Sequence, residues 1–393
     1  MIPSDRTTTT TATTTETAAS LDTAAQDAVA LAAASRRARR RDRRVYLQSH
    51  PALFALLCAT RHRPVLRLGR TLLVHGTDAY HEALTRVPLH RTAPGTTGGA
   101  AARLTDGGLL FDQDGGDHRA ARRALASEVD TAARARIRPL WRAVLAEHVP
   151  DLITGELELV DLVRELAGTT AVALTGASVP ARQLAHATAE AAAATARDHL
   201  PGPRPGRSRA AAEAVDAAAR LTRLLPDPRD AMVAVAAVNT TLAAVPRAVA
   251  WCADARLWTT VDATSAPRLA AELLRLTAPS PLLPRAAAAD ATLAGHRVRR
   301  GDRLILVARH AAHAHHRTAN PNPGSTPDPD PTTTQAVFGA GPHACPGAGL
   351  ARAQLADVIL ALAPHRPVVT RARVDRRSAL PGYAELTLRR GRF

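Results

Sequence analysis

The feature that most constrains this sequence is a cysteine in a glycine-rich loop that runs directly into an apolar helix. The loop, Phe338 to Gly347, reads FGAGPHACPG, and the segment after it reads AGLARAQLADVILAL. Unpaired N–H groups and the positive dipole at the start of such a helix favour the thiolate form of Cys345. Gly339 and Gly341 would let the backbone approach a flat group closely. The alternative is a buried structural cysteine in a glycine turn, which leaves the spacing of the aromatic, glycine and cysteine residues unexplained.

The composition favours a mainly helical fold. Of the 393 residues 46% are apolar and only 3% aromatic, with alanine and leucine prominent, which favours helices over strands. The length suits one large domain with a sizeable core. We therefore predict a mainly α protein with small β-sheets, in which residues 1–22 form a disordered threonine-rich tail and residues 23–393 form a single domain.

Local patterns place the elements within that domain. Val65–Val74 alternates around Gly69 and predicts a β-hairpin, and a helix is expected from Asp117. A long apolar helix should start near Asp227 or Asp230. The other expected features are a flexible loop at Thr92–Gly108, a break at Leu200–Arg209, a helix opened by Ser265, strands at Thr292–Val307, irregular coil at Asn320–Thr334, a helix after Gly347 and a closing strand pair.

The charge of the chain is strongly positive. The formal net charge is +16, and all 51 basic residues are arginine, which predicts attraction to acidic partners. No helix-turn-helix, zinc-finger or aromatic–basic RNA-binding signature accompanies the arginines, so nucleic-acid binding is not expected. The cluster Arg36–Arg44 is interpreted as a solvated helix end, with a nucleic-acid arm as the alternative.

Cysteine usage and the N-terminal segment bear on location. Cys58, Cys252 and Cys345 form no CxxC pair and no disulfide framework, which suits a reducing cytoplasm. Residues 1–25 have no apolar signal-peptide core, and we find no run of about 18 apolar residues that predicts a membrane span. We expect a cytoplasmic monomer that is not associated with membranes.

Four positions of the cysteine loop carry a family resemblance. Phe338, Gly341, Cys345 and Gly347 match the fixed positions of F-x-x-G-x-x-x-C-x-G, so the sequence resembles the cytochrome P450 family, in particular its soluble bacterial members. The resemblance implies a triangular helical prism around a buried haem b, with Cys345 as the axial iron ligand, whose electron donation favours O–O cleavage. By the same resemblance Phe338, Gly339, Gly341 and Gly347 pack at the haem, and His343 faces a haem propionate.

Further positions match the family upstream of the loop. Glu272-Leu-Leu-Arg275 resembles its E-x-x-R motif, a helical ion pair with a structural role. His118 and Arg122, at i and i+4, and Arg285 correspond to propionate-binding residues of the family. For these three the alternative is a solvated basic surface.

The long central helix departs from the family at the distal side of the haem. The family pattern A-G-x-[D/E]-T-[T/S] aligns with the segment AAVNTT at 236–241, so Thr240 matches the threonine that hydrogen-bonds dioxygen. Ala237 replaces the glycine and Asn239 replaces the acid, and an amide cannot cycle a proton at neutral pH. We take these three as candidate catalytic positions. Pro246 should bend the helix one turn later.

Two departures lie near the cysteine in sequence. Pro346 removes a backbone N–H that could soften the thiolate, which predicts a more electron-rich sulfur. The stretch ARHAAHAHH is histidine-rich where bacterial members usually read Ala-Asn-Arg-Asp-Pro. Its histidines do not have the spacing of a common zinc site, so we expect no metal there; they are His310, His313, His315 and His316.

The resemblance implies an oxidative enzyme, either a monooxygenase or a coupling and cyclisation enzyme. The substrate is expected to be a small, largely apolar molecule of secondary metabolism, as in antibiotic biosynthesis, with electrons supplied by an acidic ferredoxin and its ferredoxin reductase. Arg119, Arg123 and Arg352 are the candidate docking residues. The alternative enzyme uses an oxidant borne by the substrate, such as peroxide or an N–O bond, or catalyses a dehydration. A non-enzymatic haem-binding or nucleic-acid-binding protein is a third class.

The expected substrate pocket is mostly aliphatic. By resemblance it is lined by Leu282, Leu283 and the turn near Leu380. Arginines around the break in the helical region raise the question of an anionic substrate group, against the alternative of a solvated loop; they are Arg197, Arg204, Arg207 and Arg209.

Overall fold

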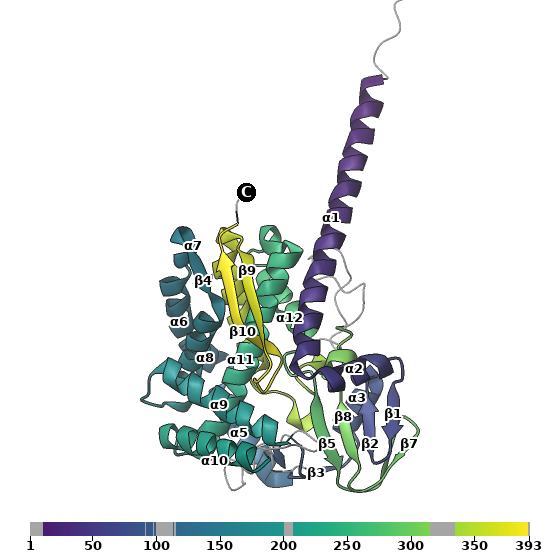
Figure 1. The fold of residues 1–393 in the computed structure, drawn as a ribbon, viewed down its shortest axis with the longest axis vertical. Helices are drawn as coiled ribbons and strands as arrows, with labels where there is room; N and C mark the ends of the chain where they lie inside the picture. The colour runs from purple at the N-terminus through teal and green to yellow at the C-terminus, as the bar shows by residue number, and fades with distance from the viewer. Residues whose placement is uncertain are drawn as a thin grey trace, which may run out of the picture.

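The computed structural model of the chain describes residues 11–90, 92–96, 98–99, 113, 115–199, 207–314 and 335–391, with the backbone alone at 11–28, 197–199 and 207–208. Most of these residues are helical, and three small sheets accompany the helices. Helices α5 to α10 lie on one side of the body and the largest sheet on the other, with α11 between them (Figure 1). The predicted mainly α fold with small sheets is confirmed.

Helix α11 (Pro228–Ala255) runs through the middle of the molecule (Figure 1). Asp227 caps it by accepting a hydrogen bond from the Arg229 backbone N–H at 2.8 Å, and Pro228 takes the first helical position, where its missing N–H costs nothing. The helix continues through Pro246, and its second half is almost wholly buried. By length and hydropathy α11 could cross a membrane, a feature that we did not find in the sequence. Its most apolar window is, however, 61% buried inside the protein, as expected of a core helix.

The helical side is built from consecutive elements. Before α11 these are α5 (Gly115–Glu128), α6 (Thr131–His148), α7 (Asp151–Thr154), α8 (Leu159–Thr175), α9 (Ala181–His199) and α10 (Arg207–Leu224). Gly168 allows α8 and α9 to approach closely, because a Cβ atom there would lie 2.0 Å from the Ala181 carbonyl oxygen. Asp117, expected to start α5, lies instead in its first turn, where its charge still favours the helix dipole.

The largest sheet contains the predicted hairpin. Strands β1 (Val65–Leu68) and β2 (Thr71–Val74) pair antiparallel around Gly69, which has a φ of 60°. The sheet order is β1-β2-β8-β5-β3, with β8 (Arg303–Leu306) parallel to β2. Strand β5 (Leu283–Ala287), which the sequence analysis did not predict, pairs with β8 and with β3 (Leu89–His90).

Two smaller sheets complete the β-structure. Strand β10 (Gly382–Arg389) lies between β9 (Val368–Asp375) and β4 (Glu156–Glu158), which confirms the closing strand pair and adds an unpredicted third strand. Strands β6 (Ala291–Leu293) and β7 (His296–Val298) form a separate hairpin. The remaining elements are α2 (Pro51–Thr60), α3 (Thr77–Thr85), η1 (Leu257–Thr260), α12 (Ala266–Thr277), α13 (Ala308–Ala311), η2 (Gly341–His343), α15 (Ala348–Leu362) and η3 (Ala363–His365).

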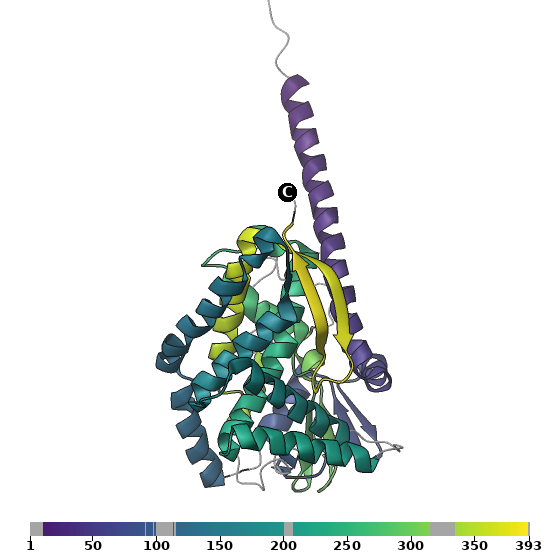
Figure 2. The same cartoon turned by 60° about the vertical axis from the view of Figure 1, so that its left-hand side comes forward.

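Helix α1 (Thr11–Ser49) begins earlier than expected. Residues 11–22 were predicted to be disordered, but the helix includes them, since the alanine-rich sequence that follows is a strong helix former. Its N-terminal part projects away from the body in both views (Figures 1 and 2). Its C-terminal part buries Ala38, Val45 and Tyr46 against the protein. Residues 1–10 lie outside the described part of the chain.

The main hydrophobic core surrounds α11. It joins side chains of α6, α8, α11, α12 and α15 with those of β10, and it contains the buried Trp141 and Trp251. A second cluster lies between the largest sheet and α3, and a third joins α8, α9, α10 and α11. The cysteine loop lies between the first two clusters: Phe338 packs on the first, and Ala336 and Ala340 belong to the second.

Candidate functional site

The cysteine loop has a defined backbone geometry. The Cys345 N–H donates to the Phe338 carbonyl oxygen at 2.7 Å, which closes the loop just before α15 begins at Ala348. Gly339 and Gly341 have φ values of 77° and 66°, in the region that favours glycine. At Gly341 a Cβ atom would also lie 3.0 Å from the Leu84 carbonyl oxygen. Glycine is therefore required at 341 by conformation and by space.

The Cys345 thiol is accessible and lies close to charged groups. The surrounding protein nevertheless desolvates its side chain and raises the pKa of the thiol. The Gly347 N–H group, Arg122 and Arg352 act in the opposite direction and favour the thiolate. The expected support from the helix terminus is thus present at Gly347, but burial outweighs it for the free thiol.

Basic groups gather beside this cysteine. The rings of His118, on α5, and His343 have centroids 3.9 Å apart, and His118 is buried. Arg122, one turn after His118, is half-buried and close enough to lower the Cys345 pKa. Within the described residues its guanidinium has no acidic partner. The structure thus brings together four predicted residues from two distant segments of sequence.

Arg285 approaches from the largest sheet. It lies on β5, and burial lowers the pKa of its guanidinium. Nearby Tyr80 donates its hydroxyl to the Ala336 carbonyl oxygen at 2.8 Å, and Ala336 in turn accepts from the Gly339 N–H. These contacts connect Arg285 with the start of the cysteine loop.

Arg352 stacks on the predicted Phe338. Its guanidinium lies 4.6 Å from the ring centroid and donates to Gln335 Oε1 at 3.3 Å. Arg352 is half-buried, and its charge favours the thiolate form of Cys345. Arg119 and Arg123, on the outer face of α5, are exposed.

The Glu272–Arg275 pair is buried and bidentate. Arg275 Nε and Nη2 donate to the two Glu272 carboxylate oxygens at 2.7 and 2.5 Å. Arg275 Nη1 also donates to the Ala312 carbonyl oxygen at 2.5 Å. The pair therefore braces α12 against the segment that follows α13.

The candidate distal residues lie on α11 with their donors turned to their own helix. Asn239 Nδ2 donates to the Val235 carbonyl oxygen and Thr240 Oγ1 to the Ala236 carbonyl oxygen, both at 2.8 Å. Ala237, which has no polar side chain, directly follows the two acceptor residues, and its carbonyl oxygen lies 3.5 Å from Thr240 Oγ1. These side-chain hydrogen bonds leave the oxygen lone pairs of Asn239 and Thr240 available as acceptors.

One polar group near the distal helix was missed in the sequence analysis. Gln354 on α15 is buried, donates to Thr170 Oγ1 at 2.7 Å, and accepts a long hydrogen bond of 3.5 Å from Thr241. It therefore connects the cysteine helix with the residue after Thr240. A glutamine within the apolar segment after the loop was the available sequence signal.

The expected pocket residues come from two directions. Leu283 opens β5 and packs on the second core cluster, while Leu282 packs on a smaller cluster around Tyr46 and Phe54. Leu380 lies in the turn before β10, and a Cβ atom on Gly382, the first residue of that strand, would lie 3.7 Å from the Leu242 carbonyl oxygen of α11.

Several predicted segments fall outside the described residues. These include most of the loop Thr92–Gly108, the coil Asn320–Thr334, the break from 200 to 206 including Arg204, and the histidines His315 and His316. The side chains of Arg197 and Arg207 are also outside. Arg209 is described, and its exposed side chain pairs with Glu213 on the same helix at 3.1 Å, which favours the solvated interpretation.

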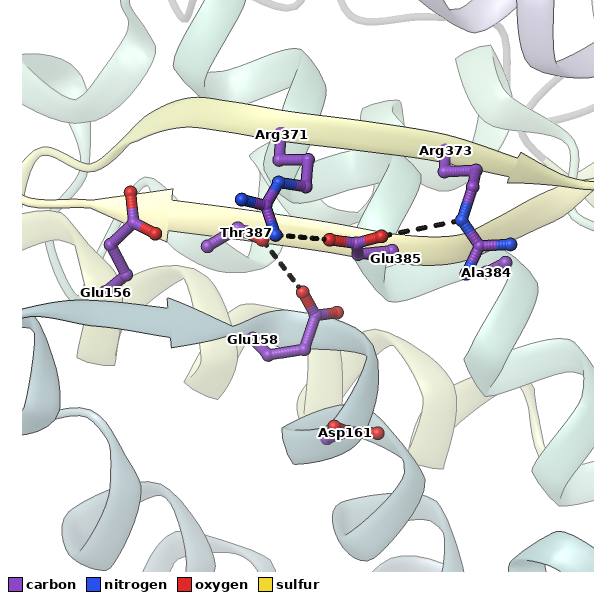
Figure 3. A pocket seen from close by; sticks show the side chains of 8 residues that line it. All are labelled: Glu156, Glu158, Asp161, Arg371, Arg373, Ala384, Glu385 and Thr387. Atoms are coloured by element: carbon purple, nitrogen blue, oxygen red, sulfur yellow. Dashed lines mark hydrogen bonds and ion pairs between the residues drawn. The ribbon is translucent and has the colours of Figure 1, made fainter.

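A surface groove elsewhere on the protein contains none of the candidate site residues. It measures about 450 Å³ and lies over the β4-β10-β9 sheet (Figure 3). Glu385 is held between Arg371 and Arg373, and Glu158 accepts from Thr387 and from two backbone N–H groups. Both of these carboxylates are therefore already paired with groups of the protein.

Comparison with known proteins agrees with this geometry. A family model described as Cytochrome P450 matches residues 268–362, which include Glu272, Arg275 and the cysteine loop. The chain is thus similar to the cytochrome P450 family over this segment. Members of that family are oxidoreductases, and haem b is the cofactor that the similarity implies.

Solved P450 structures share the fold at low sequence identity. The haem domain of a Tepidiphilus thermophilus P450 is 18% identical with a TM-score of 0.65, covering 87% of this chain and 94% of that one. A Bacillus megaterium P450 in complex with testosterone is 18% identical with a TM-score of 0.67, covering 88% and 100%. The mycinamicin VIII C21 methyl hydroxylase of Micromonospora griseorubida is 20% identical with a TM-score of 0.63, covering 82% and 92%. Among curated proteins no sequence matches the chain.

The described residues fit a haem. An accessible thiol within the protein, two glycines in the left-handed region and a half-buried arginine without an acidic partner suit a flat iron macrocycle that carries carboxylates.

Proposed function

We propose that Cys345 is the axial ligand of the haem iron in this P450, and that His118, Arg122, Arg285 and His343 hold the haem propionates. The observation that carries the proposal is the accessible Cys345 side chain, presented by a closed loop at the start of α15 and flanked by Arg122. Bound haem supplies the oxidative chemistry.

The residues of the chain orient and tune the site. The Gly347 N–H group donates to the sulfur and favours its anionic form. Pro346 offers no second backbone donor there, so the sulfur keeps more of its electron density. Arg352 stacks on Phe338 and so joins α15 to the start of the cysteine loop.

The proposed substrate is a small, largely apolar molecule, and the proposed setting is secondary metabolism in the cytoplasm. The aliphatic lining from β5 and the turn before β10 supports an apolar substrate. The fold neighbours solved with testosterone and with mycinamicin VIII accept apolar molecules of this kind. An anionic substrate group would depend on Arg197, Arg204 or Arg207, since Arg209 is already paired.

The leading reaction is monooxygenation or oxidative coupling, with electrons from an acidic ferredoxin and its reductase. The exposed Arg119 and Arg123, on the helix that carries His118 and Arg122, support a docking surface for an acidic protein.

A second candidate keeps the haem but uses a substrate-borne oxidant or catalyses a dehydration. Its support is the side-chain chemistry of α11. Neither Asn239 nor Thr240 ionises near neutral pH, and both donate to carbonyls of their own helix. Neither side chain can therefore act as a proton source in the way that a carboxylic acid can.

Asn239→Asp separates the two candidates. If the enzyme activates dioxygen, an acid here should raise the ratio of product formed to NADH consumed by about tenfold, a fraction of what a positioned acid can contribute. Product, NADH and released peroxide are measured with a ferredoxin system, and Thr240→Ala should lower the same ratio. A wild-type enzyme that forms product without consuming dioxygen, and that loses activity in Asn239→Asp, would establish the second candidate.

A further inference from the structure

A single buried carboxylate on α1 holds two arginines from distant parts of the chain. Asp42 Oδ1 accepts from Arg247 Nε at 2.8 Å, and Asp42 Oδ2 accepts from Arg309 Nη2 at 2.6 Å. The exposed fractions of the three side chains are 3% for Asp42, 0% for Arg247 and 8% for Arg309. The Arg309 guanidinium also lies 4.7 Å from the ring centroid of Tyr46, one turn after Asp42.

The far side of Arg247 reaches the turn that lies beside the distal helix segment. Its Nη1 donates to the Pro381 carbonyl oxygen at 3.4 Å. Pro381 is in the turn that carries Leu380, and the next residue, Gly382 at the start of β10, packs on α11 at Leu242. Arg247 thus connects Asp42 with one of the elements proposed to line the substrate pocket.

Arg309 holds the other side of that pocket. Its Nη1 donates to the carbonyl oxygens of Leu276 and Thr277 at 3.2 and 3.1 Å, where α12 ends. Its backbone N–H donates to the Pro281 carbonyl oxygen at 3.3 Å, directly before Leu282 and Leu283. The segment from α12 to β5 is therefore tied to the same carboxylate.

The balance of charge makes Asp42 the critical member of this network. Two guanidinium groups are buried around one carboxylate, so removing its charge leaves two cations facing each other in a poorly solvated interior. The Arg247 guanidinium also binds the Pro381 carbonyl group, and the Arg309 guanidinium binds carbonyl groups at the end of α12. Repulsion between the two cations would therefore displace the turn at Pro381 and the segment that leads from α12 to Leu282.

We propose that Asp42 is a positioning residue for the substrate pocket, which fixes the turn at Leu380 and the segment at Leu282–Leu283 relative to α11 through Arg247 and Arg309. The proposal rests on the proposed function for the location of the pocket. It does not depend on the identity of the substrate. It assigns to α1 a role in substrate selection that the sequence motifs do not indicate.

Asp42→Asn tests the proposal, and Asp254→Asn is the matched control. Asp254 also joins α1 to α11 through a buried carboxylate, which Arg41 binds with its Nε at 2.5 Å and its Nη2 at 3.1 Å. Among the residues that the structure describes, however, no hydrogen bond or ion pair joins Arg41 to the pocket segments. Hydrogen exchange is followed in peptides covering 276–287 and 376–386. Binding of imidazole and of the bulkier phenylimidazole to the haem is followed by the Soret shift.

Asp42→Asn should accelerate exchange in both peptides and weaken phenylimidazole binding by about tenfold, while imidazole binding and the carbon monoxide spectrum stay unchanged. Asp254→Asn should leave all four readouts as in the wild type. The same response in both variants, or unchanged exchange in Asp42→Asn, would overturn the proposal. If the wild-type protein itself shows no red-shifted Soret band with carbon monoxide, the proposed function is contradicted instead.

Arg309→Gln keeps the test decisive if Asp42→Asn does not fold. This variant keeps the Asp42–Arg247 ion pair and its contact with Pro381, and it removes the guanidinium of Arg309 with its contacts to Asp42, Leu276 and Thr277. Exchange should then rise in the 276–287 peptide and not in the 376–386 peptide. A rise in both peptides, or in neither, would contradict the assignment of Arg309 to the α12–β5 segment and of Arg247 to the turn at Pro381.

Discussion

At the scale of single residues, the buried ion pairs differ in kind from the many arginines on the surface. Arg275 and Glu272 form a bidentate pair shielded from water, whereas Arg209 and Glu213 pair on an exposed helix face. Screening by water and salt makes exposed pairs weak, while loss of one partner of a buried pair leaves an uncompensated charge. The E-x-x-R pattern identified this pair from the sequence. No pattern identified Asp42, because its partners are more than 200 residues away.

Arg275→Ala should therefore destabilise the protein by about 3–5 kcal/mol, the usual cost of leaving a buried charge unpaired. Urea unfolding followed by circular dichroism measures it. Arg209→Ala is the control and should cost less than about 1 kcal/mol, since Arg209 is exposed. Equal losses in the two variants would mean that the Glu272–Arg275 pair does not brace the core.

At the scale of elements, the histidine-rich stretch at α13 forms part of a buried junction with α2 and β2. His75 and His310 face each other with their Nδ1 atoms 2.8 Å apart. Thr60 donates its hydroxyl to the Leu56 carbonyl oxygen, so it accepts from His75 Nε2–H at 3.1 Å. His75 Nδ1 is then an acceptor, and His310 must donate to it. The junction therefore requires a neutral His75.

Acid should weaken this junction. Burial, with a contribution from nearby His62, lowers the pKa of His75 to about 4. Because the unfolded chain binds a proton below about pH 6.5 and the folded chain does not until about pH 4, stability falls as the pH drops through this window, by up to about 3 kcal/mol. Urea midpoints between pH 7 and 4 should fall more steeply in the wild type than in His75→Gln. Parallel pH profiles would contradict this assignment.

Elements with strong local signals were predicted well. The hairpin at Gly69, the helix capped by Asp227, the helix after Ser265 and the closing strand pair are all present. The unpredicted β5 contains a proline and an arginine, and its strand conformation comes from pairing with β8, a long-range contact. The candidate site was likewise predictable residue by residue, but the meeting of His118 with His343 required the fold.

At the scale of the whole molecule, the excess of arginine gives the protein a strong positive field. The net charge of +16 attracts acidic proteins in general, so a docking site has to be distinguished from bulk attraction. Exposed arginines on the outer face of α1 and on α5 provide this comparison, because both sets are solvated and belong to different elements. Only those on α5 adjoin the candidate haem site.

Reversing charge on α5 should impair electron delivery. Arg119→Glu combined with Arg123→Glu should raise the KM for an acidic ferredoxin by about tenfold at low ionic strength, and the effect should shrink as salt screens the charges. Arg40→Glu combined with Arg44→Glu makes the same change of net charge on α1. If both double variants raise the KM equally, bulk charge and not the α5 surface governs the encounter.

The central claim is that Cys345 binds the haem iron as a thiolate, and one spectrum tests it most directly. The reduced, carbon monoxide-bound protein should show the strongly red-shifted Soret band of a thiolate ligand. Cys345→Ala should abolish that band, while Cys58→Ala and Cys252→Ala, at the two other cysteines of the chain, should retain it. A red-shifted band that persists in Cys345→Ala would contradict the account.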